Sequence, residues 1–178
     1  MEIIKTKLND CFIIKPTLFE DERGYFYESY NQKKFTQLSG IDIDFVQDNQ
    51  AKSNFGILRG LHFQKGEHAQ AKLVSVIKGR VIDIAVDIRP ESSTYLQHIA
   101  IELSELNHLQ LFVPRGFAHG YSVLEDNTIF FYKCDNFYHK DAEGGIIYND
   151  PSLQIDWQLK PSEMILSEKD QLLPTILG

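Results

Sequence analysis

Lys72-Leu-Val-Ser-Val-Ile-Lys-Gly79, followed directly by Arg80-Val-Ile-Asp-Ile-Ala-Val-Asp-Ile88, has the clearest secondary-structure pattern in the chain. β-Branched residues dominate the first run, which ends in a Lys-Gly turn signal. The second run alternates strictly, so that Ile82, Ile84, Val86 and Ile88 share one face, and Asp83 and Asp87 share the other. Both runs therefore predict β-strands.

Further short strand candidates surround this stretch at 96–103, 109–113, 118–123 and 128–134. Turn residues such as Glu125-Asp-Asn127 separate them. This spacing predicts an antiparallel sandwich or barrel. Helical patterns occur only near the two ends, at 31–38, which Gly40 stops, and at 167–170, where Ser167 is a typical N-cap.

Composition limits the class of protein. A chain of 178 residues fits one domain, 1–178. The formal net charge of −7 disfavours nucleic-acid binding, and no apolar run has the length of a membrane span. Cys11 and Cys134 are the only cysteines and form neither a disulfide framework nor a zinc motif, and the N-terminus lacks a signal-peptide pattern. We therefore expect a cytoplasmic protein.

The segment 56–64 places Arg59 and His62 among glycine and apolar residues. A neutral imidazole near a carboxylate suits a general base, although a single histidine in a strand is more often a packing residue. Lys72 begins the next strand, where it is either a solvated edge residue or a stabiliser of a developing enolate. Arg59 and His62 are three positions apart, so they share a pocket only if the strand bends, which Gly60 permits.

The segment Phe112-Val-Pro-Arg-Gly-Phe-Ala-His-Gly-Tyr121 resembles the P-x-G-x-x-H motif of the cupins, a family of small β-barrels that commonly bind a metal. The first cupin motif requires H-x-H and then a glutamate seven residues before a glycine. Here Gln64 replaces the second histidine, and Lys72 replaces the glutamate. A protonated lysine has no lone pair to offer a metal, so we expect a cupin barrel without a metal or other cofactor.

Blocks along nearly the whole chain resemble the dTDP-4-dehydrorhamnose 3,5-epimerase family. They occur in the family's order, and they are Asp21-Glu-Arg-Gly-Tyr-Phe-Tyr-Glu28, Phe45-Val-Gln-Asp-Asn49, Leu58-Arg-Gly-Leu-His-Phe-Gln64, Lys72-Leu-Val, Pro114-Arg-Gly-Phe-Ala-His-Gly120, Phe131-Tyr-Lys133, Asn149-Asp-Pro151, Ile155-Asp-Trp157 and Ser167-Glu-Lys-Asp170. The resemblance implies a mainly β fold, a cupin-type antiparallel jelly-roll barrel with short helices near the two ends.

The resemblance also implies roles for individual residues. His62 matches the family's base, Asp170 its carboxylate partner, Tyr132 the opposing acid and Lys72 the lysine after the base strand. By themselves, Tyr132 in its aromatic run and Asp170 at a helix start are ordinary structural residues. The implied reaction is cofactor-independent proton transfer at C3 and C5 of a dTDP-4-keto-6-deoxy sugar, which gives dTDP-4-dehydro-L-rhamnose for L-rhamnose synthesis.

Other matches imply substrate contacts. Arg59 and Arg23 match phosphate ligands, and Gln47, Asn49 and His119 match sugar or phosphate contacts. Phe26, Glu28 and Tyr138 match the nucleobase end. In the family, the segment from Arg23 to Glu28 crosses to a neighbouring subunit, which implies a homodimer.

Four alternatives remain open at this point. The nearest is an epimerase that acts only at C3 or only at C5, because its catalytic residues would look the same. A sugar-nucleotide 3,4-ketoisomerase is disfavoured by the block at 58–64. A non-catalytic sugar-nucleotide-binding cupin would not need His62 to face Tyr132, and a metal-dependent oxygenase is disfavoured by Lys72.

Overall fold

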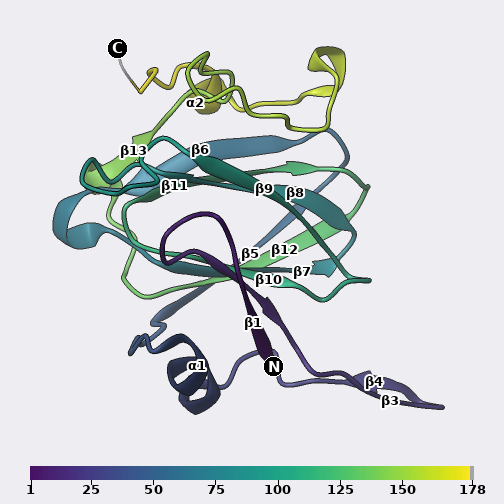
Figure 1. Cartoon of the computed structure of the whole chain (residues 1–178). Coiled ribbons are helices and arrows are strands. Elements are labelled where there is room, and N and C mark those ends of the chain that lie inside the picture. Colours follow the sequence, from purple (N-terminus) through teal and green to yellow (C-terminus); the bar gives the residue numbers. More distant parts are fainter. Residues whose placement is uncertain (177–178) are drawn as a thin grey trace.

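Two antiparallel sheets face each other in the structure, a computed structural model that describes residues 1–176 (Figure 1). The lower sheet has six strands in the order β1 (Glu2–Lys5), β2 (Phe12–Lys15), β10 (Gln110–Val113), β7 (Lys72–Lys78), β12 (Thr128–Cys134) and β5 (Gln47–Ser53). The upper sheet has five, in the order β13 (Glu143–Gly145), β6 (Leu58–Gln64), β11 (Phe117–Val123), β8 (Arg80–Asp87) and β9 (His98–Ser104).

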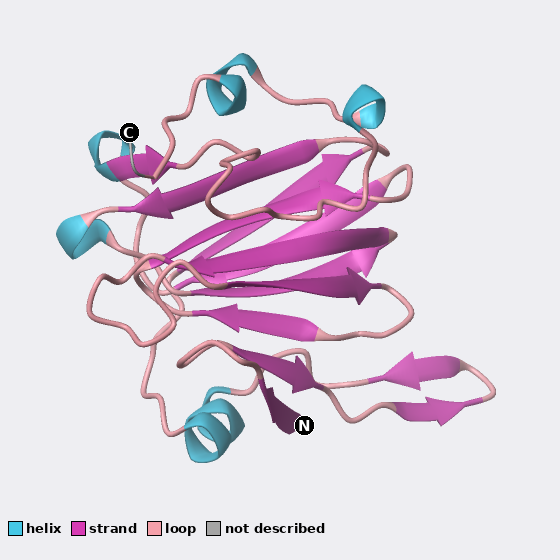
Figure 2. Ribbon diagram, turned by 45° about the horizontal axis from the view of Figure 1, so that its top comes forward, coloured by secondary structure: helices cyan, strands magenta, loops and turns pink. Residues whose placement is uncertain are grey.

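The remaining elements lie outside this barrel. The strands β3 (Phe19–Asp21) and β4 (Gly24–Phe26) form a two-stranded arm that projects away from it. The helices are α1 (Gln32–Ser39), α2 (Glu168–Gln171) and three short 3₁₀ turns at Gly66–His68, Lys140–Ala142 and Pro161–Glu163 (Figure 2). None of the helices in residues 1–176 has the length and apolarity needed to cross a membrane.

Apolar side chains fill the space between the sheets. Val74 and Phe130 of the lower sheet belong to one cluster with Val81 and Leu103 of the upper sheet, and all four are at most 1% exposed. Burying a side chain of this size stabilises the fold by roughly 1.5–3 kcal/mol. This core fills much of the barrel interior and leaves the site described below at its edge.

The outer faces of both sheets are also covered. The C-terminal segment packs Trp157 against Ile82 and Ile84 of β8, and α1 packs Phe35 against Phe112 of β10. The alternation predicted for β8 is confirmed, but both of its faces are buried. Its aspartates share a face with Val81 and therefore point into the barrel.

The predicted mainly β barrel is confirmed, and the predicted strands from residue 72 onward correspond to β7–β12. The two terminal helices also lie where the sequence places them. Asn31 caps α1 by accepting from the Lys34 amide, and Gly40 ends this helix in the left-handed conformation with φ 72°.

Candidate active site

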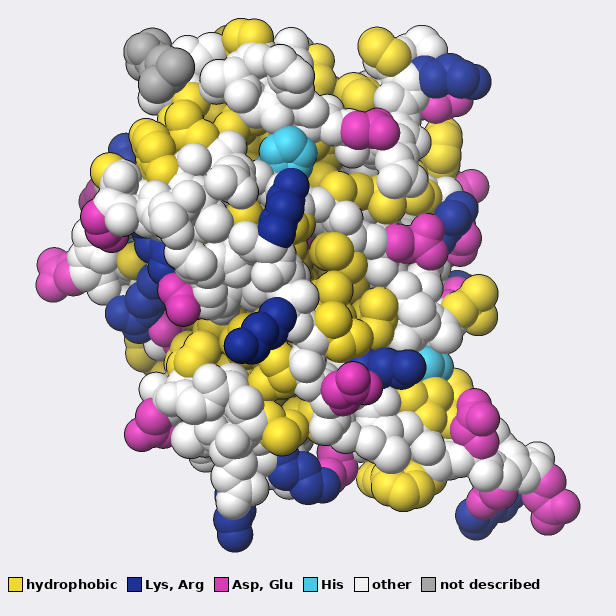
Figure 3. All heavy atoms as spheres, viewed as in Figure 1, with side chains coloured by type: hydrophobic (Ala, Val, Ile, Leu, Met, Phe, Trp, Pro, Cys, Tyr) yellow, Lys and Arg dark blue, Asp and Glu magenta, His cyan; other side chains and the backbone are white. Residues whose placement is uncertain are grey.

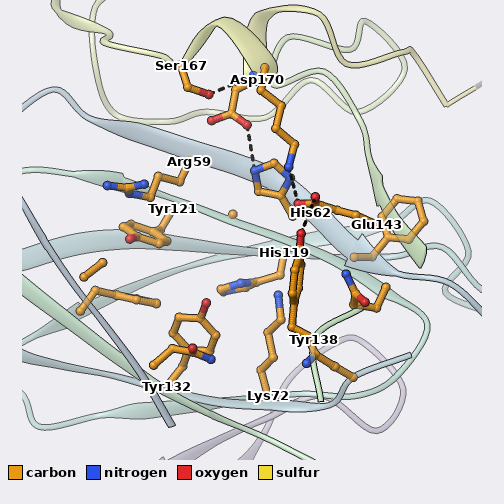
Figure 4. Close-up of a pocket in the computed structure, with 18 of the residues that line it drawn as sticks. Arg59, His62, Lys72, His119, Tyr121, Tyr132, Tyr138, Glu143, Ser167 and Asp170 are labelled. Atoms are coloured by element: carbon orange, nitrogen blue, oxygen red, sulfur yellow. Dashed lines mark hydrogen bonds and ion pairs between the residues drawn. The ribbon is translucent and has the colours of Figure 1, made fainter. Parts of the chain in front are cut away.

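A cavity of about 500 Å³ opens between the two sheets and is lined by residues of both (Figure 4). Its upper wall comes from β6 and β11 and carries His62 and His119. Its lower wall comes from β7 and β12 and carries Lys72 and Tyr132. The topology therefore brings side chains from distant parts of the chain to face one another.

A β-bulge turns Arg59 and His62 toward the same cavity. In the pairing of β6 with β11, His62 lies opposite His119, and Arg59 lies opposite Tyr121. Between these two pairs the chain advances by three residues in β6 and by two in β11. The additional residue in β6 is what defines a β-bulge. The bend that the sequence predicts near Gly60 is confirmed, since both side chains line the cavity.

His62 meets Asp170 although the two are far apart in the sequence. Nε2 of His62 lies 2.8 Å from Oδ1 of Asp170, whose side chain is only 6% exposed. Ser167 fixes the start of α2 by accepting from the Asp170 amide at 3.1 Å. Burial lowers the pKa of His62 below its usual value, Asp170 opposes this shift, and Lys72 adds to it. The imidazole is therefore neutral near pH 7, as a general base requires.

Tyr132 and Lys72 lie on the opposite wall. The Lys72 ammonium is 5.8 Å from the centre of the Tyr132 ring. Burial raises the pKa of Tyr132, so that its hydroxyl keeps its proton at neutral pH, and burial lowers the pKa of Lys72. A protonated phenol thus faces a neutral imidazole across the cavity.

His119 forms a second histidine–carboxylate pair. Its Nε2 lies 2.9 and 3.0 Å from the two carboxylate oxygens of Asp83, and both residues are buried. The residues at the cupin metal positions do not fit a metal ion, because Oε1 of Gln64 accepts from the His139 amide and Lys72 supplies an ammonium. Among residues 1–176, no three His, Cys, Asp or Glu side chains form a cluster that could hold one.

The other predicted contacts of the pocket also line it. Gln47 donates to Oδ1 of Asn49 at 3.0 Å, and both side chains face the cavity. Arg59 reaches Ser53, with 3.4 Å between Nη2 and Oγ. Tyr138 stands at the cavity's edge, where its ring is half exposed.

Arg23, Phe26 and Glu28 do not reach the cavity of their own chain. Arg23 and Phe26 lie in the projecting arm, where Arg23 is paired with Asp21, and Glu28 is paired with Lys34. The structure of one chain therefore does not bring these three residues to the rest of the site.

Four further side chains line the cavity that the sequence does not predict as site residues. They are Gln64, Tyr121, Glu143 and Lys169. Nζ of Lys169 lies 2.5 Å from Oε1 of Glu143. The Tyr138 hydroxyl donates to the other oxygen, Oε2, at 3.1 Å. Lys169 directly precedes Asp170 in the block 167–170, so its position in that block could have indicated a place in the site. Glu143 lies in a segment without a pattern, so only the fold reveals it.

This arrangement suits proton transfer at carbon. A base on one wall and an acid on the other can remove a proton from one face of a substrate and return a proton to the opposite face. Arg59, Lys72 and Lys169 surround the cavity with cations, which suits an anionic substrate. The fold and site thus define a β-barrel with a cavity whose residues suit the acid–base chemistry of an isomerase.

Comparison with known proteins identifies the family. The family model described as dTDP-4-dehydrorhamnose 3,5-epimerase matches residues 5–177, and this chain belongs to that family. The epimerase of this name from Escherichia coli K12 is 47% identical over 176 residues, which cover 99% of this chain and 95% of that protein. That from Methanothermobacter thermautotrophicus is 47% identical, covering 94% and 90%. The protein is therefore an enzyme of the epimerase class.

Solved structures agree. A dTDP-4-dehydrorhamnose 3,5-epimerase from Elizabethkingia anophelis is 58% identical, with a TM-score of 0.96 over 99% of this chain and 97% of that one. The Legionella pneumophila enzyme in complex with dTDP-4-keto-L-rhamnose is 46% identical, with a TM-score of 0.94 over 98% and 92%. A 3′-monoepimerase from Streptomyces bikiniensis is 26% identical, with a TM-score of 0.90 over 99% and 88%.

Proposed function

We propose that the protein inverts both C3 and C5 of dTDP-4-dehydro-6-deoxy-D-glucose and so produces dTDP-4-dehydro-L-rhamnose for L-rhamnose synthesis. The observation that carries this proposal is the placement of His62 and Tyr132 on opposite walls of one cavity. The identity of 47% to the Escherichia coli 3,5-epimerase, against 26% to the monoepimerase, favours the double reaction.

In the proposed mechanism, His62 removes the proton from C3 or C5. The C4 ketone makes these protons acidic, and the electron pair of the broken C–H bond moves to the ketone oxygen as an enolate. Lys72 stabilises that charge, as a cation in a water-poor pocket can. Tyr132 then gives its proton to the same carbon from the opposite face, and exchange with solvent restores both residues. No step requires a cofactor.

Asp170 has a supporting role in this mechanism. Its Oδ1 lies 2.8 Å from Nε2 of His62, close enough to act on the charge of the imidazole. A carboxylate in this position holds the imidazole in one tautomer and stabilises the imidazolium that forms.

The other cavity residues would bind the substrate. Arg59 suits the diphosphate, because a guanidinium can contact phosphate oxygens with two parallel hydrogen bonds. Gln47, Asn49 and His119 would contact the sugar or a phosphate, and Tyr138 would stack on the thymine ring.

We also propose a homodimer in which the arm completes the partner's site with Arg23, Phe26 and Glu28. The exposed aromatic side chains of the arm support this proposal, since Phe19, Tyr25 and Phe26 are 55–66% exposed. Acidic and basic side chains gather at the arm's tip (Figure 3), where they would reach a polar site. We place this one-domain enzyme, residues 1–178, in the cytoplasm.

Proton NMR in deuterated water tests the function. The purified protein is incubated with dTDP-4-keto-6-deoxyglucose, and deuterium incorporation is followed at each carbon. Incorporation at both C3 and C5 is the expected result. Incorporation at one carbon would identify a single-site epimerase, and none at either would indicate a binding protein. His62→Ala serves as the control and should abolish incorporation while the fold stays intact.

A further inference from the structure

The loop after β12 carries Tyr138 along the edge of the cavity and is fastened to both sheets. The Tyr138 amide donates to Oε1 of Gln47 at 3.1 Å, and the next amide, of His139, donates to Oε1 of Gln64 at 3.0 Å. Gln47 belongs to β5 of the lower sheet, and Gln64 belongs to β6 of the upper sheet. Two consecutive amides are thus bound from opposite walls.

The glutamine side chains are themselves held in place. Nε2 of Gln47 donates to Oδ1 of Asn49 at 3.0 Å, which leaves the Gln47 carbonyl oxygen facing the loop. Gln64 is only 9% exposed, and its amide group cannot turn over without losing the bond to His139. The bond between them is partly buried, and a hydrogen bond of this kind contributes roughly 0.5–1.5 kcal/mol, so it favours one loop conformation.

The phenol end of Tyr138 is fixed as well. Its hydroxyl donates to Oε2 of Glu143, whose other oxygen is paired with Lys169 of α2. Tyr138 is therefore tied at its backbone and at its hydroxyl, while 52% of the residue remains exposed. A ring held in this way presents a flat face to a ligand at little further entropic cost.

We propose that Gln64 is a positioning residue whose side-chain oxygen holds the 138–139 backbone, so that Tyr138 is fixed in place before the substrate arrives. The effect on binding rests on the proposed function, in which Tyr138 meets the nucleobase. The effect on the loop does not depend on it.

Amide hydrogen exchange by NMR tests the loop without any ligand. Gln64→Met keeps the length of the side chain and removes its oxygen. Gln50→Met is the matched control, because Gln50 is an exposed residue of β5. In Gln64→Met, the His139 amide should exchange about tenfold faster while the amides of β7 and β8 are unchanged. Unchanged exchange at His139 would overturn the proposal.

Calorimetry with dTDP tests the consequence for binding. We expect Gln64→Met to weaken dTDP binding about fivefold, the loss typical of one hydrogen bond, and to raise KM while kcat stays within about twofold. In a Tyr138→Ala background the same substitution should add almost nothing, because the ring that it positions is gone. An equal loss in both backgrounds would show that Gln64 acts elsewhere and would overturn the proposal.

Failure of the proposed function has a different signature. A wild-type protein that neither binds dTDP nor exchanges sugar protons refutes that function. The exchange rate of the His139 amide in Gln64→Met then still decides whether Gln64 holds the loop.

Discussion

The imidazole of His62 accepts a proton only while it is neutral, and the pocket controls this through its pKa. Burial and the charge of Lys72 lower that pKa below its usual value of 6.5, against the opposing effect of Asp170. Because a lowered pKa keeps the base unprotonated at more acidic pH, we expect the acidic limb of kcat/KM to lie below pH 6.5. A pH–rate profile of the wild-type protein checks this, and a limb above that value would contradict it.

Asp170→Asn separates the charge of Asp170 from its shape. The aspartate raises the pKa of His62, so its neutralisation should move the acidic limb to still lower pH. The rate should fall by about 10²- to 10⁴-fold, because the imidazolium loses its counter-charge. The profile of this variant is the measurement. A limb that moves to higher pH, with a near-normal rate, would remove Asp170 from the mechanism.

Tyr132→Phe removes one hydroxyl and leaves the ring. We expect inversion to slow by about 10²- to 10⁴-fold, the usual contribution of a general acid. His62 remains able to remove and return a proton on its own face, so deuterium should still enter the sugar with retained configuration. NMR of the product mixture distinguishes exchange from inversion. An unchanged rate and product ratio would show that another group is the acid.

The bulge in β6 depends on Gly60. This residue has φ 120°, and a Cβ atom there would lie 2.6 Å from Cα of Gly120 and 2.8 Å from the His119 carbonyl oxygen. Gly60→Ala should therefore destabilise the protein by more than about 2 kcal/mol and displace His62. Urea unfolding and the epimerase assay measure the two effects.

Gly66→Ala is the matched control for this variant. Gly66 also has a positive φ, of 58°, but apart from its own turn and chain neighbours no atom of residues 1–176 lies within 4 Å of the position that an added methyl group would take. Its cost should be only the left-handed backbone, about 1 kcal/mol, with activity retained. Equal losses in the two variants would show that the close approach of β6 to β11 is not the constraint.

The sequence predicted some elements far better than others, for a physical reason. The runs that became β7 and β8 have apolar periodicity because they are buried, and the helix caps have specific side chains. β5 is instead polar at nearly every position, because half of it faces the cavity and half faces solvent. β3 and β4 are wholly exposed and left no apolar pattern to read.

Some residues of the site could likewise be predicted from the sequence, and others could not. The chemistry of Arg59, His62 and Lys72 made them candidates, but for each a structural role was equally consistent with the local sequence until the family resemblance favoured the site. The bend between the first two was inferred from Gly60. The pairing of His62 with Asp170 could be proposed only by resemblance, since no local rule joins residues so far apart. Glu143 was missed because its place beside Tyr138 arises from the pairing of β13 with β6.

In the proposed homodimer, each site combines residues of both subunits, and this arrangement predicts that two inactive variants can complement each other. His62→Ala and Arg23→Ala should each be inactive or severely impaired, because His62 serves its own pocket and Arg23 serves the partner's. In a heterodimer of the two variants, one pocket combines an intact His62 with an intact Arg23. Random pairing makes half of the dimers mixed, so about a quarter of the wild-type activity should return.

Co-expression with two affinity tags provides the mixed dimers. His62→Ala with Tyr132→Phe is the control pair, because both residues belong to one pocket and no intact site can form. Recovery with the control pair, or none with the first, would contradict an arm that reaches across the dimer.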